Sequence, residues 1–181
     1  MTSRAGGFTL IELVVFVSMI GIALGGVLVA YDYAARDSAD PIVKKQALAI
    51  AESLLEEVQQ MPFTVCDPDD PAVFDPATPC AMAEATGPEA GESRYSATTP
   101  FDNVNDYHGY DTALEAPPGI KDVTGAPIAG LRAYNARVTV GNAALPGIPA
   151  GEALLITVDV TGPYNVSARI EGYRTRHAPQ L

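Results

Sequence analysis

The first thirty residues constrain this chain more than any other part of it. From Phe8 to Ala30 the sequence is apolar and carries a single charge, that of Glu12. A helix of that length spans roughly 35 Å, which exceeds the roughly 30 Å hydrocarbon core of a bilayer. The segment therefore predicts a transmembrane helix.

A cleavable secretory signal explains this segment poorly. Such a signal has a shorter apolar core of about 7–15 residues and ends in small residues. Here Val29 and Ala30 are followed by Tyr31 and Asp32, which make a poor cleavage site. We therefore expect the apolar segment to be retained in the mature protein.

Glu12 is the residue that a simple membrane anchor leaves unexplained. A charged side chain in a membrane segment costs on the order of 2.5 kcal/mol or more at the bilayer centre, and less near an end. If the peptide bond after Gly7 is cut, the new amino group of Phe8 adds its charge to the positive end of the helix dipole. Glu12 then lies one helical turn away, where it can neutralise the amino group of its own chain or of a neighbouring subunit.

The leader Met1–Gly7, the aromatic Phe8 and the acidic Glu12 together resemble the prepilin signal of type IV pilins and type II secretion pseudopilins. The resemblance implies a filament subunit and not an enzyme. It implies cleavage between Gly7 and Phe8 and N-methylation of Phe8 by a prepilin peptidase/methyltransferase. It also implies that Glu12 recruits the subunit into a growing filament, with other pilin subunits and the pilus assembly platform as partners.

Further segments resemble one branch of that family, the MshD-type minor pilins of MSHA pilus systems. The first proline is Pro41, whereas major pilins often carry a proline in the membrane helix, and this difference favours a minor subunit. The segments that carry the resemblance are 36–41, 46–57, 101–110, 153–158 and 172–179.

Two other functions remain open at this stage. The first is a type II secretion pseudopilin, which is the same class of subunit in a different machine. The second is a membrane-anchored extracytoplasmic domain, with a binding or enzymatic role, whose anchor carries an acid for another reason.

The resemblance also predicts the location of the chain. Counting Arg4 upstream against Arg36, Lys44 and Lys45 downstream favours the opposite orientation by the positive-inside rule. We nevertheless expect a single-pass inner-membrane protein with a cytoplasmic N-terminus, because the leader must meet a peptidase on the cytoplasmic face. The C-terminal domain is then periplasmic, and later part of a pilus at the cell surface.

The composition supports one acidic domain beyond the anchor. The chain has 181 residues and a net charge of −11. No basic patch is present in the body, so nucleic acid is not an expected partner. Proline and glycine concentrate between Pro62 and Pro149, which indicates a loop-rich middle.

The only two cysteines, Cys66 and Cys80, flank a segment rich in proline and aspartate. Proline fixes φ and removes a donor, so this segment is neither a helix nor a central strand. A disulfide would restrain a loop that has little core of its own, by about 3 kcal/mol in the chain-entropy model. We expect the pairing if the domain is exported; the alternative is two free thiols in a cytosolic protein.

The helical pattern continues past the membrane segment. Asp40 and Pro41 look like a cap and a first-turn proline, so the helix restarts or kinks there. Pro62 ends the helix. An amphipathic stripe precedes it, formed by Ala47, Leu48, Ala51, Leu54, Leu55, Val58 and Met61.

Period-two alternation predicts strands over 131–140, 153–161 and 166–175, with a turn at Gly162–Asn165 between the last two. A further short strand is possible near 120–123. The helical stripe is the available cover for this antiparallel meander. The predicted fold is α+β and pilin-like, with a long N-terminal helix packed on a C-terminal sheet. Its regions are the leader 1–7, the transmembrane or filament-core helix 8–30, the amphipathic continuation 31–61, the loop-rich region 62–130 and the sheet 131–181.

Two groups of acidic and amide residues crowd the loop-rich region. Calcium takes about six to eight oxygen ligands, but Pro71 and Ala72 fall where an EF-hand loop needs a ligand followed by glycine. We expect both groups to be solvated, with no metal or other cofactor bound. They are Asp67, Asp69, Asp70 and Asp75 in the cysteine loop, and Asp102, Asn103, Asn105, Asp106 and Asp111 beyond it.

No catalytic constellation stands out in the sequence. The two histidines, His108 and His177, are far apart and away from the cysteines. No Ser-His-Asp order, phosphate loop or zinc spacing is present. The sequence therefore indicates a protein that is not an enzyme.

Overall fold

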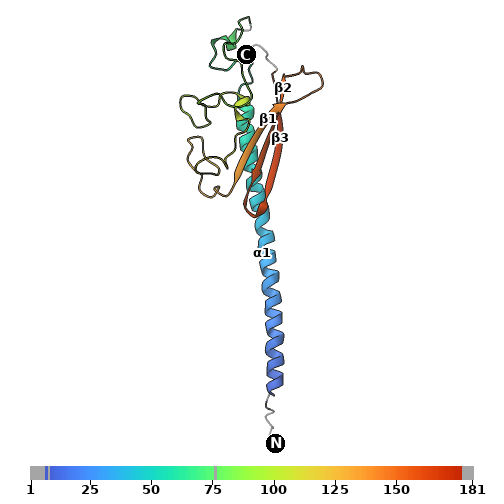
Figure 1. Cartoon of the computed structure of the whole chain (residues 1–181). Coiled ribbons are helices and arrows are strands. Elements are labelled where there is room, and N and C mark those ends of the chain that lie inside the picture. The colour runs from blue at the N-terminus through green and yellow to red at the C-terminus, as the bar shows by residue number, and fades with distance from the viewer. Residues whose placement is uncertain (1–6, 8, 76, 177–181) are drawn as a thin grey trace. The chain divides into compact units, whose positions relative to one another are not determined.

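The computed structural model describes residues 7, 9–75 and 77–176, without the side chains of residues 35–40 and 74. The chain divides into two compact units, Met1–Ile42 and Val43–Leu181. The predicted α+β architecture is confirmed, since a long helix is followed by an antiparallel sheet (Figure 1). The elements are helix α1 (Leu10–Gln60), strands β1 (Asn135–Asn142), β2 (Ala153–Thr161) and β3 (Ser167–Thr175), and the short 3-10 helices η1 (Pro71–Phe74), η2 (Val104–Tyr107) and η3 (Pro163–Asn165).

The first unit contains the apolar half of α1. Its side chains from Leu10 to Ala34 are exposed on every face of the helix; Ile22, for example, is 77% exposed. Ser18, one of the polar residues here, donates its hydroxyl to the carbonyl of Val15 at 2.8 Å. A helix that is apolar all round needs lipid or other helices around it. This unit therefore requires an apolar environment that it does not supply itself.

The helix continues through Pro41 instead of restarting there. The sequence predicts a restart or a kink at Asp40 and Pro41, but α1 is one element with Pro41 inside it. The prediction of a second helix capped by Asp40 is therefore wrong. Proline lacks an N–H, so one carbonyl in the preceding turn loses its usual partner, a loss that the flanking helical residues tolerate.

In the second unit, α1 turns one face towards the protein core. Leu48, which the sequence pattern also placed on this face, is 40% exposed. The helix ends at Gln60, just before Pro62, as predicted. The buried residues recur at steps of three and four positions, and they are Ala47, Ala51, Leu54 and Val58.

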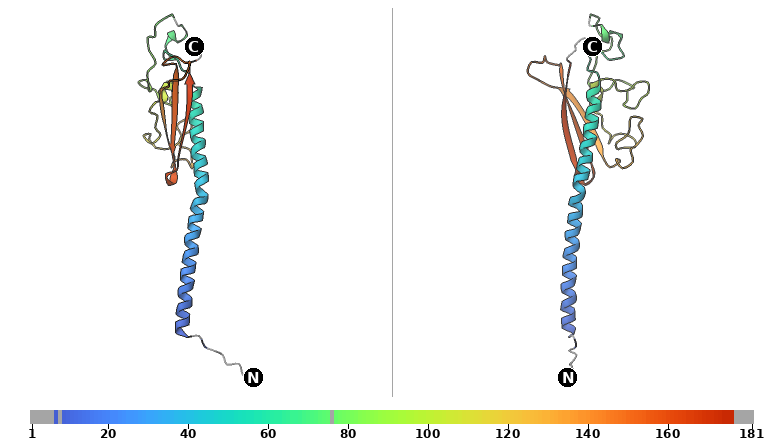
Figure 2. Two further views of the ribbon diagram at one scale, coloured as in Figure 1. Left: turned by 90° about the vertical axis from the view of Figure 1, so that its right-hand side faces the viewer. Right: turned by 180° about the vertical axis from the view of Figure 1, so that it is seen from behind.

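The three strands form one antiparallel sheet in the order β1-β2-β3. Its apolar face and the stripe of α1 belong to one hydrophobic core, and both panels of Figure 2 show the strands beside the second half of α1. Burying a Val or Ile side chain contributes roughly 1.5–3 kcal/mol, so this layer is a main source of stability. The register places buried residues directly opposite one another: Ala136 and Val160, Val138 and Val158, and Val140 and Ile156.

The first strand begins later than the alternation predicts. The expected start is Leu131, whereas β1 begins at Asn135, because the preceding residues turn: the Tyr134 N–H donates to the Leu131 carbonyl at 3.0 Å. Tyr134 nevertheless lies in the core, and its hydroxyl donates to Gln46 Oε1 at 2.8 Å. Strands β2 and β3 match their predicted ranges within one residue.

The turn between β2 and β3 forms at Gly162–Asn165, as predicted. Tyr164 and Asn165 have φ values of 58° and 60°. The Val166 N–H closes the turn on the Pro163 carbonyl at 3.2 Å. Positive φ at both central residues is the geometry of a type I′ turn, whose twist suits a tight hairpin.

Between α1 and β1 the described residues form loops with the two short helices η1 and η2, and the predicted short strand near 120–123 is wrong. Lys121 makes only an isolated bridge with Pro127. The Asp122 N–H donates to the Ala126 carbonyl at 2.9 Å, so the chain reverses in a tight turn instead of extending.

Part of the loop-rich region protects the outer edge of the sheet. The Gly109 N–H donates to the Val138 carbonyl at 3.1 Å, and the Val138 N–H donates to the Tyr110 carbonyl at 2.9 Å. An uncovered edge strand presents unpaired backbone groups to other chains. The segment after η2 satisfies these groups on β1.

Substituting Gly172 by valine should destabilise the second unit by about 1 kcal/mol, the low end of the cost of overpacking, because only the flexible side-chain ends of Gln59 and Leu55 have to move. A Cβ at Gly172 would collide with Gln59 Nε2 and lie 3.1 Å from Leu55 Cδ1. Gly141→Val is the matched control, since a Cβ at this β1 position meets nothing within 4 Å. Denaturant unfolding of the detergent-solubilised chain measures both, and equal stabilities would contradict this account of the helix–sheet contact.

Candidate functional site

Of the N-terminal site residues predicted from the sequence, the structure describes Gly7, before α1, and Glu12, in its first turn. Gly7 is exposed, and Phe8 lies outside the described residues. Glu12 is exposed in the first turn, and its backbone N–H donates to Thr9 Oγ1 at 3.3 Å. A threonine at this point caps the helix, and an acid in the first turn interacts favourably with the helix dipole. The position of Glu12 therefore lowers the cost of its charge.

Leu10–Ala34 is a stretch of α1 that is long and apolar enough to cross a membrane, with a mean hydropathy of 2.7. This property follows from length and composition alone. It fits a membrane span or a signal anchor near the N-terminus.

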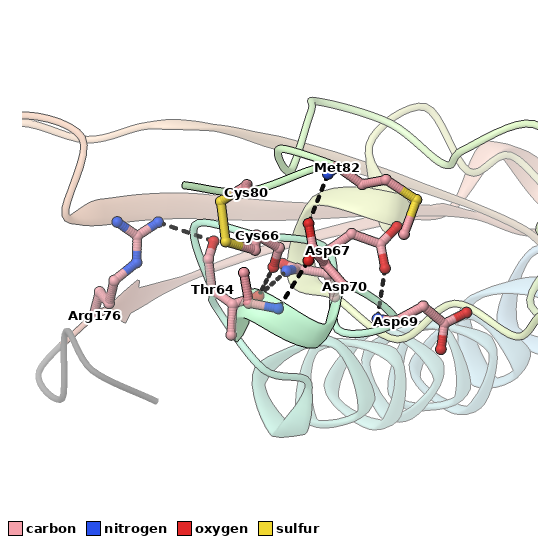
Figure 3. The surroundings of a disulfide bond; sticks show 10 residues. Thr64, Cys66, Asp67, Asp69, Asp70, Cys80, Met82 and Arg176 are labelled. Atoms are coloured by element: carbon pink, nitrogen blue, oxygen red, sulfur yellow. Dashed lines mark hydrogen bonds between the residues drawn. A yellow bond between two sulfur atoms is a disulfide. The ribbon is translucent and has the colours of Figure 1, made fainter. Parts of the chain in front are cut away.

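Cys66 and Cys80 form a disulfide, which confirms the predicted pairing (Figure 3). Between them, Asp70 caps η1 by accepting from the Ala72 N–H at 2.8 Å. The other carboxylate oxygen of Asp70 accepts from the Met82 N–H at 2.6 Å. This bond from Met82, with that from Ala72, holds the pKa of Asp70 below its ordinary value. Asp70 is therefore engaged in holding the loop together.

The chain after Cys80 turns back and pairs with the chain before the disulfide loop. The Asp67 N–H donates to the Met82 carbonyl at 3.1 Å, and the Glu84 N–H donates to the Val65 carbonyl at 2.9 Å. This short ladder places Glu84 next to the cysteine loop. Sequence reasoning assigned no role to Glu84.

Thr64 links this loop to two other parts of the second unit. Its hydroxyl donates to the Cys66 carbonyl at 2.7 Å and accepts from Asn103 Nδ2 at 2.9 Å. Arg176, just after β3, donates to the carbonyls of Thr64 and Phe63, both at 3.1 Å. Figure 3 shows the Arg176 side chain reaching Thr64. The guanidinium of Arg176 thus fixes the base of the loop by donating to two backbone carbonyls.

The two acidic groups that are separate in the sequence meet in the structure. Carboxylate oxygens of Asp67 and Asp69, from the first group, lie within 4.8 Å of one another and of one from Asp102 in the second. A second trio within the same distance, Asp67, Glu89 and Glu92, shares Asp67 with the first. A third, Glu84, Glu89 and Asp106, shares Glu89 with the second, and the whole set is called here the acidic cluster. Its members are Asp67, Asp69, Glu84, Glu89, Glu92, Asp102 and Asp106.

The expectation that these acidic groups are solvated is wrong for the centre of the cluster. Asp106 is 1% exposed and Asp67 is 5% exposed. Both carboxylate oxygens of Glu84 and Oδ1 of Asp106 are buried without a hydrogen-bond partner. The other oxygen of Asp106 accepts from the backbone N–H groups of Asp102 and Asn103, at 2.9 and 2.7 Å. The arrangement thus aligns Asp106 firmly and leaves its second oxygen unpaired.

Burial and neighbouring acids raise the pKa values of Glu84, Glu92 and Asp102 in the cluster. Burial raises the pKa of Glu84 to about 8, and the charge of Asp106 adds to the effect. Burial likewise raises the pKa of Glu92 to about 7 and that of Asp102 to about 6. Among the ion pairs between described residues, none includes a member of the cluster. Negative charge is therefore gathered here without a paired cationic side chain.

A different acid, Glu57 of α1, fastens the loop-rich region to the helix. Its two oxygens accept from Arg94 Nε and Nη2 at 2.6 and 2.5 Å, and the hydroxyl of Tyr107 donates to Glu57 Oε1 at 2.9 Å. Burial alone would raise the pKa of Glu57, but the bonds and charge of Arg94 outweigh it and lower the pKa. Arg94 also lies over the rings of Tyr95 and Tyr110. This bidentate pair is a structural contact.

His108, the histidine that the structure describes, contacts the backbone of β1. Nδ1 of His108 lies 2.7 Å from the Val140 carbonyl oxygen and 3.2 Å from the Val140 nitrogen, so this ring nitrogen is committed to the backbone of β1. His177 lies outside the described residues.

Comparison of the chain with models of known protein families, with curated proteins and with solved structures gave no match. Sequence reasoning identified the helix start and the disulfide but missed the acidic cluster. Its signal was the set of acids at Glu84, Glu89 and Glu92, between the two groups that the sequence does single out.

Replacing both Cys66 and Cys80 by serine should leave the chain folded but loosen the cysteine loop. The loop spans a sequence separation of 14, for which the chain-entropy model gives about 3 kcal/mol. The helix and sheet core does not include this loop, so its contacts should survive. Limited proteolysis and thermal melting measure the effect, which should be faster cleavage within residues 66–80 and a lower melting temperature. Two titratable thiols in the denatured, unreduced wild-type chain would refute the pairing.

Proposed function

We propose that this chain is a minor subunit of a type IV pilus, most similar to the MshD-type minor pilins of MSHA pilus systems. The observation that carries the proposal is Glu12, an acid in the first turn of a helix whose following residues, Leu13–Ala30, are exposed and, apart from Ser18, apolar. A plain anchor gains nothing from that charge within the membrane. A subunit cut after Gly7 does, because its new amino terminus needs a nearby negative charge.

The proposed assembly chemistry follows from the spacing. After cleavage, the amino group of Phe8 and the helix dipole both place positive charge at the start of α1. Glu12 lies one helical turn further on, on a helix that is apolar on all sides. In a bundle of such helices, the low dielectric strengthens the attraction between Glu12 and an amino terminus. The same charge pair therefore favours correct axial alignment of neighbouring subunits.

The division of the helix supports the same proposal. The apolar half requires lipid or other helices around it, and the second half buries one stripe against the protein's own sheet. A filament subunit needs both properties, since it leaves the membrane and enters a helical core while its domain stays folded. The disulfide fits an oxidising compartment outside the cytoplasm.

A pseudopilin of a type II secretion system remains the nearest alternative. The two differ in the filament that incorporates the subunit, so isolating the filament and identifying its major subunit separates them. A membrane-anchored domain of another class would enter neither filament. The mass of the mature chain separates that class: loss of Met1–Gly7 with a methylated Phe8 supports a pilin, whereas an intact Met1 or cleavage after Ala30 contradicts it.

Gly7→Val should block removal of the leader. Two residues without side chains precede the bond to Phe8, and they allow a peptidase to approach the backbone closely. A β-branched side chain at position 7 restricts that approach. Immunoblotting and mass spectrometry of membrane fractions should show the full-length chain, with Gly21→Val as the control because a Cβ there meets nothing within 4 Å. Efficient cleavage of the Gly7 variant would contradict the prediction.

Glu12→Ala should permit membrane insertion and leader removal but strongly reduce incorporation into filaments. Removing the charge makes the helix a better membrane span while leaving the new amino terminus without its partner. Ser18→Ala is the matched control, because it removes a polar group from the same exposed helix without changing the charge. The ratio of sheared-filament to membrane-bound subunit measures the effect. Normal incorporation of the Glu12 variant would remove this residue from the site.

A further inference from the structure

The centre of the acidic cluster is formed by three side chains from separate loop segments. Glu84 follows the ladder that closes the cysteine loop, Glu89 lies in the next loop, and Asp106 belongs to η2. One carboxylate oxygen from each lies within 4.8 Å of the other two. Three carboxylates thus converge from three segments on one point.

The hydrogen bonding at this point is incomplete. Both oxygens of Glu84 and Oδ1 of Asp106 are buried and unpartnered, and Asp106 is almost wholly buried. A buried acceptor without a partner costs about 1–3 kcal/mol, and more when it is charged. Orphaned oxygens of two acids that face each other indicate a missing positive partner.

None of the side chains that the structure describes provides that partner. Arg176 lines the same pocket as Glu84, but its guanidinium is engaged by the carbonyls of Phe63 and Thr64 and by Glu152. The charged groups that face Glu84 are acids of the same cluster. They include Asp67, Glu89, Asp102 and Asp106.

We propose that Glu84, Glu89 and Asp106 bind one calcium ion. The remaining acids of the cluster surround the site with further negative charge. The ion supplies the partner that the buried oxygens lack and connects three loop segments that share little apolar core. The site is independent of the proposed role as a pilus subunit, since it depends on the second unit alone.

The ligand set favours calcium over magnesium. Calcium accepts about six to eight oxygens at 2.3–2.6 Å in flexible geometry, so its ligands lie at most about 5 Å apart. The trio meets that limit. Magnesium requires nearly ideal octahedral geometry and retains several waters, which a buried set of crowded carboxylates accommodates poorly. All three ligands are hard carboxylate oxygens. Softer metals prefer nitrogen or sulfur ligands, so they would bind here less well than calcium.

Titration of the full-length, detergent-solubilised chain with calcium chloride tests the proposal. Isothermal titration calorimetry after chelator treatment should give binding of one ion per chain. At about a hundredfold excess over Kd, the melting temperature should rise by roughly 5–10 °C. Magnesium chloride at the same concentration should produce a much smaller rise.

Two isosteric variants locate the ion. Glu84→Gln and Asp106→Asn should each weaken calcium binding by roughly tenfold or more, because ligand charge sets calcium affinity. In chelator at a pH above about 8, where Glu84 is ionised, Glu84→Gln should melt at or above the wild-type temperature, since it removes a buried charge. A purely structural role for Glu84 predicts the opposite sign.

Glu171→Gln is the control, because Glu171 is an exposed acid of β3 outside the cluster. It should bind calcium as the wild-type chain does. Lack of binding by the wild-type chain at millimolar calcium overturns the proposal. So does an unchanged calcium response in both cluster variants, or an equal loss in Glu171→Gln.

Discussion

Burial of the sheet's apolar face against the second half of α1 is the contact that holds the sheet to the helix in the second unit. The contact matches a helical stripe, Ala47 to Val58, with a face on which Val138 and Val158 stand opposite each other. Small residues in the stripe let the helix approach closely, and Gly172 provides the same clearance on β3. Without the helix, a three-stranded sheet of this size would expose one whole apolar face to water.

The loop-rich region depends on different forces, because it contributes few residues to that core. Its anchors are polar and specific: the disulfide, the caps made by Asp70, and the ion pair between Glu57 and Arg94. Such contacts are directional and each involves a few atoms, so they hold particular segments in particular places. The acids of the cluster converge as a result of this placement, and their crowding is tolerated because the surrounding anchors hold the loops.

The two halves of α1 remove their apolar side chains from water in different ways. In the second unit the helix buries its apolar stripe within its own chain, whereas in the first unit apolar side chains are exposed on every side. The first unit therefore depends on its surroundings for stability, and a membrane or a bundle of like helices satisfies it equally. This compatibility with both environments is the physical basis of the proposed transfer from membrane to filament. The charge of Glu12 is costly in the membrane and gains a partner, an amino terminus, in the proposed filament.

The elements that could be predicted from the sequence are mainly those in which apolar residues recur at regular spacing. The apolar run of α1, the stripe ending before Pro62, the alternation of β2 and the turn at Gly162–Asn165 are local patterns, and each formed as predicted. The disulfide also followed from local composition. The start of β1 did not, because a turn ending at Tyr134 overrides the alternation there.

Which acids lie together depends on the tertiary fold and could not be predicted from the sequence. Asp67, Glu84, Glu89 and Asp106 come from loops without periodicity, and their approach depends on a ladder, a disulfide and a 3-10 helix that meet in space. No spacing along the chain encodes that meeting. Burial of Asp106 likewise depends on the residues that pack around it and not on its own identity. The sequence therefore predicts a solvated aspartate, whereas in the fold Asp106 is buried and its Oδ1 lacks a hydrogen-bond partner.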